Sequence, residues 1–213
     1  MTIIKNQAQL AEGVSGLVEL DKDLKRMVDL DGVPPLWNRV PGFMTLVHII
    51  LEQQVSLASA QAAFDRLIDV LPKAEPQSFL SLDDATLLKV GFSRQKTRYV
   101  RCLAELLMDG TLSLASLKEM DDAAARSELM QVTGIGLWTA DIYLLMALGR
   151  ADIWPVGDLA LIKSIMHIKG FSSKPEPEVM AEITNSWRPW RSIAARILWN
   201  HYLIHLYRRA VTS

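Results

Sequence analysis

The 213-residue chain has a single cysteine, Cys102. One cysteine excludes an internal disulfide and a zinc or iron–sulfur site built on four cysteines. The chain also lacks an apolar run of about 18 residues, the length that a membrane-spanning helix requires, and its start lacks the regions of a secretory signal. We therefore expect a cytoplasmic protein with no membrane association.

Excess charge is also absent, since the formal net charge is −1. The distribution is uneven, however: residues 160–213 carry a net charge of +5 and residues 1–31 a net charge of −2. A second basic group follows Gly91 and consists of Arg94, Lys96, Arg98 and Arg101. One-sided positive charge favours binding to phosphates, although it equally suits an ordinary solvated surface.

The sequence has no alternation of apolar and polar residues typical of β-strands, and no long linker or repeat. Apolar residues at helical spacing instead predict helices along most of the chain, with a break at 72–76. The predicted ranges are 10–20, 24–30, 43–70, 81–90, 96–108, 113–118, 121–132, 138–148, 158–168, 176–184 and 189–209. This pattern predicts an all-α protein.

Two glycines, Gly134 and Gly136, separate the predicted helices at 121–132 and 138–148. A helix end with positive φ explains one glycine, but the second requires another strained position or a ligand that approaches the backbone closely. The amides that follow lie at a helix N-terminus, where anions are stabilised. The spacing indicates a helix–hairpin–helix that holds a DNA phosphate, with a monovalent ion on backbone carbonyls near Val132 as a further option.

Four short motifs occur in a fixed order between residues 53 and 199. They are Gln53-Gln54-Val55-Ser56, Gly134-Ile135-Gly136-Leu137-Trp138-Thr139-Ala140, Pro155-Val156-Gly157-Asp158-Leu159 and Pro189-Trp190-Arg191-Ser192. This set resembles the helix-hairpin-helix DNA glycosylase superfamily, and within it the 3-methyladenine DNA glycosylase II branch.

The resemblance implies a monofunctional DNA glycosylase of base excision repair. Such an enzyme flips an alkylated purine, such as 3-methyladenine or 7-methylguanine, out of double-stranded DNA and hydrolyses its N-glycosidic bond to leave an abasic site. No cofactor is expected, and the protein would act as a monomer. Two alternatives stay open: a glycosylase for a deaminated or oxidised base, and a non-catalytic module that binds damaged DNA.

The resemblance makes Asp158 the catalytic residue. Its carboxylate would stabilise the positive charge that develops at C1′ as the glycosidic bond breaks, and would orient the attacking water. The residue also begins a predicted helix, where an aspartate commonly serves as N-cap. The two roles are compatible, because a cap position fixes the orientation of the carboxylate.

Trp138, Ile142 and Trp199 are the residues that the resemblance places in the base pocket. In members of the superfamily that also cleave the DNA backbone, a lysine that forms a Schiff base stands at the position of Trp138. An indole cannot do this, but its face can stack on a cationic base. Trp138 and Trp199 equally suit burial in a helical core. Where the branch often has a tyrosine, this chain has Ile142.

The resemblance also suggests how DNA is held. The hairpin residues Gly134, Gly136 and Thr139 would contact the DNA backbone. The segment after Gly91 would insert a wedge into the gap left by the flipped nucleotide. The candidate wedge residues are Phe92, Arg94 and Gln95.

The whole chain, 1–213, is expected to form a single glycosylase unit made of two helical lobes with a cleft between them. The central helix-hairpin-helix lobe would span 41–151, and the second lobe would combine 1–40 with 152–213. His201 and His205 are spaced i,i+4, but the sequence shows no third ligand beside them, so no metal site is predicted there.

Overall fold

The structure is a computed structural model that describes residues 2–207. Within these residues the chain forms twelve α-helices, and the only extended pairing is an isolated bridge between Ile3 and Arg150. The prediction of an all-α protein is confirmed. None of the described helices is both long and apolar enough to span a membrane. The chain divides into two compact units: Arg39–Leu148, called the hairpin unit, and Met1–Asn38 with Gly149–Ser213, called the terminal unit.

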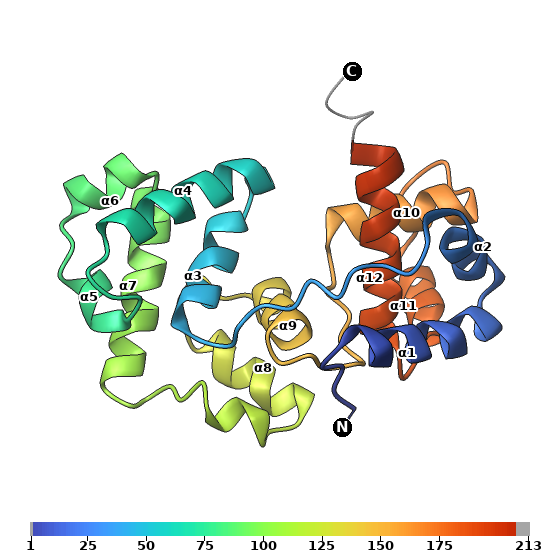
Figure 1. Ribbon diagram of the computed structural model, residues 1–213, viewed down its shortest axis with the longest axis horizontal. Coiled ribbons are helices and arrows are strands. Elements are labelled where there is room, and N and C mark those ends of the chain that lie inside the picture. Colours follow the sequence, from blue (N-terminus) through green and yellow to red (C-terminus); the bar gives the residue numbers. More distant parts are fainter. Residues whose placement is uncertain (1, 208–213) are drawn as a thin grey trace. The chain divides into compact units, whose positions relative to one another are not determined.

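The helices of the hairpin unit, drawn in Figure 1, enclose side chains that are mostly aliphatic or phenylalanine. Its elements are α3 (Phe43–Glu52), α4 (Leu57–Val70), α5 (Pro76–Leu80), α6 (Asp84–Val90), α7 (Arg94–Met108), the 3-10 turn η1 (Ser116–Lys118), α8 (Asp122–Met130) and α9 (Leu137–Met146). Helix α3 lies against α4, α7 and α9, so its apolar faces are covered on several sides.

The prediction of one helix over 43–70 is wrong, because the chain breaks between Glu52 and Leu57. Gln54 adopts a left-handed φ of 58°, which no α-helix accommodates. Ser56 then caps α4, since its side chain accepts a hydrogen bond from the amide of Ser59. The apolar pattern continues through both helices and therefore hides the break.

Helix α5 was not among the predicted ranges, because Pro72 and Pro76 suggested only a break. Pro76 instead occupies the start of the helix, where a missing amide hydrogen costs nothing. The short helix buries Phe79 completely. The ring centroid of Phe79 lies 5.6 Å from that of Phe92 and 6.2 Å from that of Phe43.

The terminal unit is built around the last long helix, which touches α1, α2 and α10 (Figure 1). Its helices are α1 (Gln7–Leu20), α2 (Lys22–Asp31), α10 (Leu159–Lys169), α11 (Pro177–Asn185) and α12 (Arg191–His201). Helix α1 approaches α12 closely at Gly13. A Cβ atom there would lie 2.2 Å from Cδ1 of Ile193 and 3.3 Å from the ring of Trp190.

The helix predicted over 189–209 begins later and changes type before its end. It starts at Arg191, after Trp190, and gives way to a π-helical segment, η2 (Tyr202–Leu206), in which the amide of Tyr207 donates to the carbonyl of Tyr202. The predicted residues 208 and 209 lie outside the described part of the chain.

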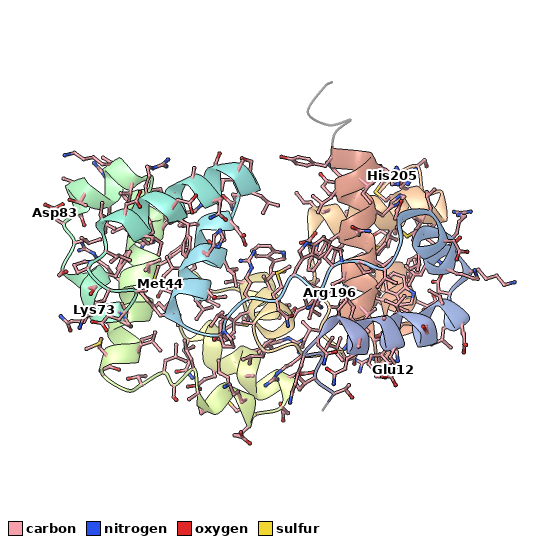
Figure 2. The ribbon with its side chains drawn as sticks, in the orientation of Figure 1. Glu12, Met44, Lys73, Asp83, Arg196 and His205 are labelled. Carbon is pink, nitrogen blue, oxygen red and sulfur yellow. The ribbon has the colours of Figure 1, made fainter. Side chains whose placement is uncertain are left out.

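Arg196 of α12 is a buried charge in the terminal unit (Figure 2). Its Nε donates to the carbonyl of Leu36 at 2.9 Å, and its Nη1 donates to the carbonyl of Ser192 at 3.2 Å. Burial lowers the pKa of Arg196 to about 10, because the charged form loses its hydration. The guanidinium thereby ties the segment after α2 to α12.

Asp21 is a second buried charge, located between α1 and α2. Its Oδ1 accepts from the amides of Asp23 and Leu24, while its Oδ2 accepts from Trp187 Nε1 at 2.9 Å and Lys169 Nζ at 3.1 Å. Burial opposes ionisation, but the bonds from Trp187, Leu24 and Lys169 outweigh it and lower the pKa of Asp21. One carboxylate thus joins three segments of the unit.

We predict that Asp21→Asn lowers the free energy of unfolding by about 1–3 kcal/mol at pH 7, since charged hydrogen bonds are lost in a buried site. A lowered folded-state pKa stabilises the fold above the pKa of an unfolded aspartate, about 3.9, and this contribution disappears as the pH falls through the folded value. The difference between the two proteins should therefore shrink below about pH 4. Urea titrations across this range measure it.

Asp29→Asn is the matched control, because Asp29 is exposed and its ion pair with Lys25 lies at the surface. It should change stability by less than about 1 kcal/mol. An equal loss in both variants would contradict the role assigned to Asp21.

Candidate active site and nucleic-acid interface

The turn between α8 and α9 forms a compact hairpin. Helix α8 ends at Met130, the amide of Ile135 donates to the carbonyl of Val132 at 3.0 Å, and α9 begins after Gly136. Val132 and Ile135 are buried beneath the turn. Among the described residues, no side chain caps the amino end of α9. The hairpin therefore presents helix N-terminal amides, the groups that bind anions in proteins.

The two glycines of the hairpin differ in why the position accepts or requires glycine. Gly134 has a φ of 92°, and a Cβ atom there would lie 2.1 Å from Cγ of Tyr99. The backbone conformation and the packing against Tyr99 therefore require glycine at position 134. Gly136 has a φ of −93°, and nothing in the described part of the chain lies within 4 Å of its would-be Cβ. The fold leaves open space at Gly136.

Gln53 holds the hairpin from the neighbouring turn. Its Nε2 donates to the carbonyl of Gly134 and to Oγ1 of Thr139, each at 2.9 Å. Gln53 follows α3 in the break described above, so this break orients an amide toward the hairpin. The carbonyls of Gly134 and Val132 accept hydrogen bonds from Gln53 and from the amide of Ile135, respectively. The monovalent ion near Val132 stays a prediction.

The remaining predicted residues of α9 have unequal exposure. Thr139 is 2% exposed and Ile142 is 3% exposed, so both side chains are buried. The hydroxyl of Thr139 accepts a hydrogen bond from Gln53, which leaves its backbone for the predicted contact with DNA. Trp138 is half-buried. Of the two predicted pocket residues on α9, it is therefore the more exposed one.

Asp158 lies in the terminal unit at the amino end of α10. Its backbone is extended, and its Oδ1 accepts a hydrogen bond from the amide of Leu161 at 3.0 Å, so it is the N-cap of the helix. Gly157 precedes it with a φ of 84° and turns the chain into the helix. The side chain is partly exposed.

Trp199 of α12 lies beside Asp158. The indole Nε1 donates to the same Oδ1 at 3.3 Å, so two donors orient this oxygen. The structure thus brings these two predicted residues together within one unit. Trp138 and Ile142 belong to the hairpin unit.

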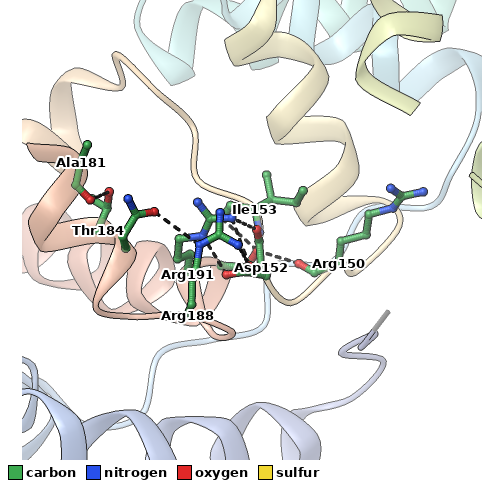
Figure 3. A network of polar contacts seen from close by, with 9 residues as sticks. Arg150, Asp152, Ile153, Ala181, Thr184, Arg188 and Arg191 are labelled. Carbon is green, nitrogen blue, oxygen red and sulfur yellow. Dashed lines mark hydrogen bonds and ion pairs between the residues drawn. The ribbon is translucent and has the colours of Figure 1, made fainter. Parts of the chain in front are cut away.

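A polar network holds the segment that leads to Asp158 (Figure 3). Asp152 accepts hydrogen bonds from Nε of Arg191 at 2.7 Å and from Nη1 of Arg188 at 3.2 Å. The buried hydroxyl of Ser192 donates to the carbonyl of Arg150 at 2.6 Å and accepts from the amide of Ile153 at 2.9 Å.

The motif at 189–192 predicted no role for Arg191 or Ser192, and Asp152 was not among the predicted site residues. The arginine and serine of the motif indicated that polar partners exist. The sequence could not show which residues these are, because the contacts join positions 36 to 42 residues apart.

The candidate wedge residues lie at the junction of α6 and α7. Phe92 is 1% exposed and belongs to the core, whereas Arg94 and Gln95 are exposed in the first turn of α7. A side chain that enters DNA must reach solvent, so Arg94 and Gln95 remain the candidates. Gln95 donates to the hydroxyl of Tyr99, whose ring lies against Gly134. The wedge segment and the hairpin are therefore adjacent in this unit.

The basic group on α7 divides into structural and exposed members. Lys96 donates to the carbonyl of Leu51 at 2.6 Å, and burial lowers its pKa. Arg101 pairs with Asp84 at 2.7 Å. Arg94 and Arg98 are exposed on the same helix and are the members that face solvent.

Solved structures share this fold. One is a 3-methyladenine DNA glycosylase of Schizosaccharomyces pombe in complex with abasic DNA, which matches with a TM-score of 0.81 at 22% identity and covers 91% of this chain and 98% of that one. A DNA-3-methyladenine glycosidase from Bacillus halodurans matches with a TM-score of 0.74 at 25% identity, covering 94% of this chain and 92% of that one. The chain therefore has the fold of these structures.

The family model described as HhH-GPD superfamily base excision DNA repair protein matches residues 47–189, and the chain belongs to this superfamily. The resemblance inferred from the four motifs is confirmed. The Bacillus subtilis protein YfjP is 28% identical over 162 residues, covering 72% of this chain, and the chain spans 56% of the length of that relative.

We predict that Gly134→Ala lowers the free energy of unfolding by about 2–5 kcal/mol, because the new methyl group meets the ring of Tyr99 at a strained φ. Gly136→Ala is the matched control, since its φ is ordinary and its surroundings are open. It should change stability by no more than about 0.5 kcal/mol. Urea denaturation followed by circular dichroism compares them, and equal values would contradict the two roles.

Proposed function

We propose that this protein is a monofunctional DNA glycosylase that removes alkylated purines from double-stranded DNA. The observation that carries the proposal is the carboxylate of Asp158, oriented at the N-terminus of α10 by the amide of Leu161 and the indole of Trp199. The names of the two solved structures with this fold, which refer to 3-methyladenine, support the choice of base. The protein acts as a monomer.

The chemistry requires one well-placed anion. The bond between C1′ and the base nitrogen breaks, its electron pair leaves with the base, and positive charge develops at C1′ and the ring oxygen. Asp158 stabilises this charge and orients a water molecule, whose oxygen attaches to C1′ while its proton is lost to the surroundings. A purine that already carries positive charge from alkylation leaves as a neutral molecule, so a separate acid is unnecessary.

Trp138 supports the monofunctional assignment. In the resembling enzymes that cut the DNA strand, this position is a lysine whose amine attacks C1′. An indole has no nucleophilic amine and offers an aromatic face to an extruded base instead. The proposal therefore ends the reaction at an abasic site with an intact strand.

Gly136 supports the binding of a DNA phosphate at the hairpin. The fold itself does not need a glycine there, because a Cβ atom would meet nothing within 4 Å in the described residues. A ligand that approaches the amides of α9 from outside would need the space. Arg94 and Arg98 supply exposed positive charge in the same unit.

Asp158→Asn tests the catalytic proposal. Asparagine is an equally good N-cap, so the fold should remain, while the rate of base release should fall by about 100-fold or more. A methylated duplex serves as substrate, released 3-methyladenine and 7-methylguanine are measured by chromatography, and strand breaks are read with and without alkali. Breaks are expected only after alkali.

Asp121→Asn is the matched control, because Asp121 is an exposed N-cap of α8 and should leave base release unchanged. Equal release by the parent and Asp158→Asn would refute the role of Asp158. Breaks without alkali would refute the monofunctional assignment. Binding without release of any methylated base would favour a glycosylase for another base or a binding module, which deaminated and oxidised duplexes would distinguish.

Gly136→Ala tests the phosphate contact separately from the chemistry. We expect it to weaken binding to an abasic-site duplex by about 10-fold, roughly the worth of one charge-assisted hydrogen bond, with unchanged stability. Fluorescence anisotropy at fixed ionic strength measures this. Gly16→Ala is the control, since its new Cβ atom would make an ordinary contact at 3.8 Å with Trp190. Unchanged binding by Gly136→Ala would remove the hairpin contact from the proposal.

A further inference from the structure

Three side chains from two helical regions meet at one end of the terminal unit. The Oδ2 of Asp31, the last residue of α2, lies 2.7 Å from Nδ1 of His201, and its Oδ1 lies 2.6 Å from Nε2 of His205. The three groups offer ligand atoms within 4.8 Å of one another. His205 lies beyond the end of α12 (Figure 2).

This arrangement corrects the sequence prediction, which found no third ligand beside His201 and His205. The third group comes from Asp31, 170 residues earlier in the chain. A helical i,i+4 histidine pair places two nitrogen ligands on one face, and the packing of α2 against α12 supplies an oxygen ligand opposite them.

We propose that Asp31, His201 and His205 bind a divalent metal ion of the zinc class. Two imidazoles and one carboxylate are a donor set that suits Zn²⁺, and a fourth position would remain for water. A tetrahedral ion with bonds of about 2.1 Å spaces its ligand atoms about 3.4 Å apart. The contact between a histidine and the Asp31 oxygen that binds the ion would therefore lengthen by only about 0.7–0.8 Å.

His167 completes the site as a partner of one ligand. Its Nδ1 lies 2.9 Å from Nε2 of His201, and the two rings stack with centroids 5.1 Å apart. When Nδ1 of His201 binds the metal, the proton of this ring must be on Nε2, from which it donates to His167. Metal-binding histidines commonly have such a second partner, which sets their tautomer and orientation.

The electrostatics and the access of the site also suit a cation. Asp31 is at the carboxyl end of α2, where the helix dipole disfavours a negative charge, and its side chain is only 4% exposed. A cation would offset both costs. His205 is 33% exposed and stands in the π-helical segment, so an ion can enter from that side.

The test is titration of the chelator-treated, full-length protein with Zn²⁺ against a colorimetric chelator, with Co²⁺ absorption as a measure of geometry. We expect one equivalent of Zn²⁺, tetrahedral Co²⁺ bands and a rise in melting temperature on adding Zn²⁺. His205→Ala should abolish the bands and weaken Zn²⁺ binding at least as much as the loss of an outer partner does, which is about 10- to 100-fold.

Asp31→Asn should have the same effect, and His167→Gln should weaken binding by about 10-fold without abolishing the bands. His205→Ala is the decisive variant, because a partly exposed side chain can be removed without unfolding the protein. The control variants are His48→Gln and Cys102→Ser, which alter potential metal ligands in the hairpin unit and should leave Zn²⁺ binding unchanged.

Base release is not a readout, so the result is independent of the proposed glycosylase activity. Failure to bind an equivalent of Zn²⁺ would overturn the proposal and leave the cluster as a hydrogen-bonded network. Binding that persists unchanged in both His205→Ala and Asp31→Asn would also overturn it, because the metal would then be elsewhere.

Discussion

The terminal unit depends on how the chain is held between Gly149 and Ile153. The amide of Ile4 donates to the carbonyl of Gly149 at 2.7 Å, and the amide of Ala151 donates to the carbonyl of Thr2 at 3.1 Å. From the other side, Ser192 and Arg191 bond to Arg150, Asp152 and Ile153. The segment is thus fixed by both ends of the sequence. Asp158 follows Ile153 by five residues. These contacts therefore help to fix the position of the candidate catalytic carboxylate.

Charged groups do much of this work in place of apolar packing. Asp21, Arg196 and Asp152 each bond to segments far away in the sequence. A buried charge is costly unless its partners are in place, so the arrangement penalises incorrect packing of the helices more strongly than it stabilises the correct one. The terminal unit is assembled from the two ends of the chain, so its helices must find the correct partners. The charged contacts specify which helix faces meet, whereas the aliphatic faces of α1, α2 and α12 alone would tolerate several registers.

Local rules predicted the elements, and contacts distant in sequence explain what was missed. The helical fold, the hairpin and the cap at Asp158 follow from spacing and from residue types that favour particular backbone positions. The break at Gln54 escaped prediction because glutamine rarely adopts a left-handed φ and the apolar pattern continues across it. The need for glycine at position 134 comes partly from Tyr99, and the third member of the histidine cluster is Asp31. The spacing of residues in the sequence predicts neither of these two contacts. The roles of the site residues stay predictions.

An N-cap is a physically favourable place for a carboxylate that must act on a developing cation. The amide of Leu161 and the dipole of α10 orient Asp158, and the indole of Trp199 donates to the same oxygen. The amide and the indole carry no net charge, so neither contact cancels the charge of the carboxylate. Under the proposed mechanism, this charge would act on the positive charge that develops at C1′ in the transition state. An N-cap would serve that reaction because the carboxylate is already in position before the charge develops.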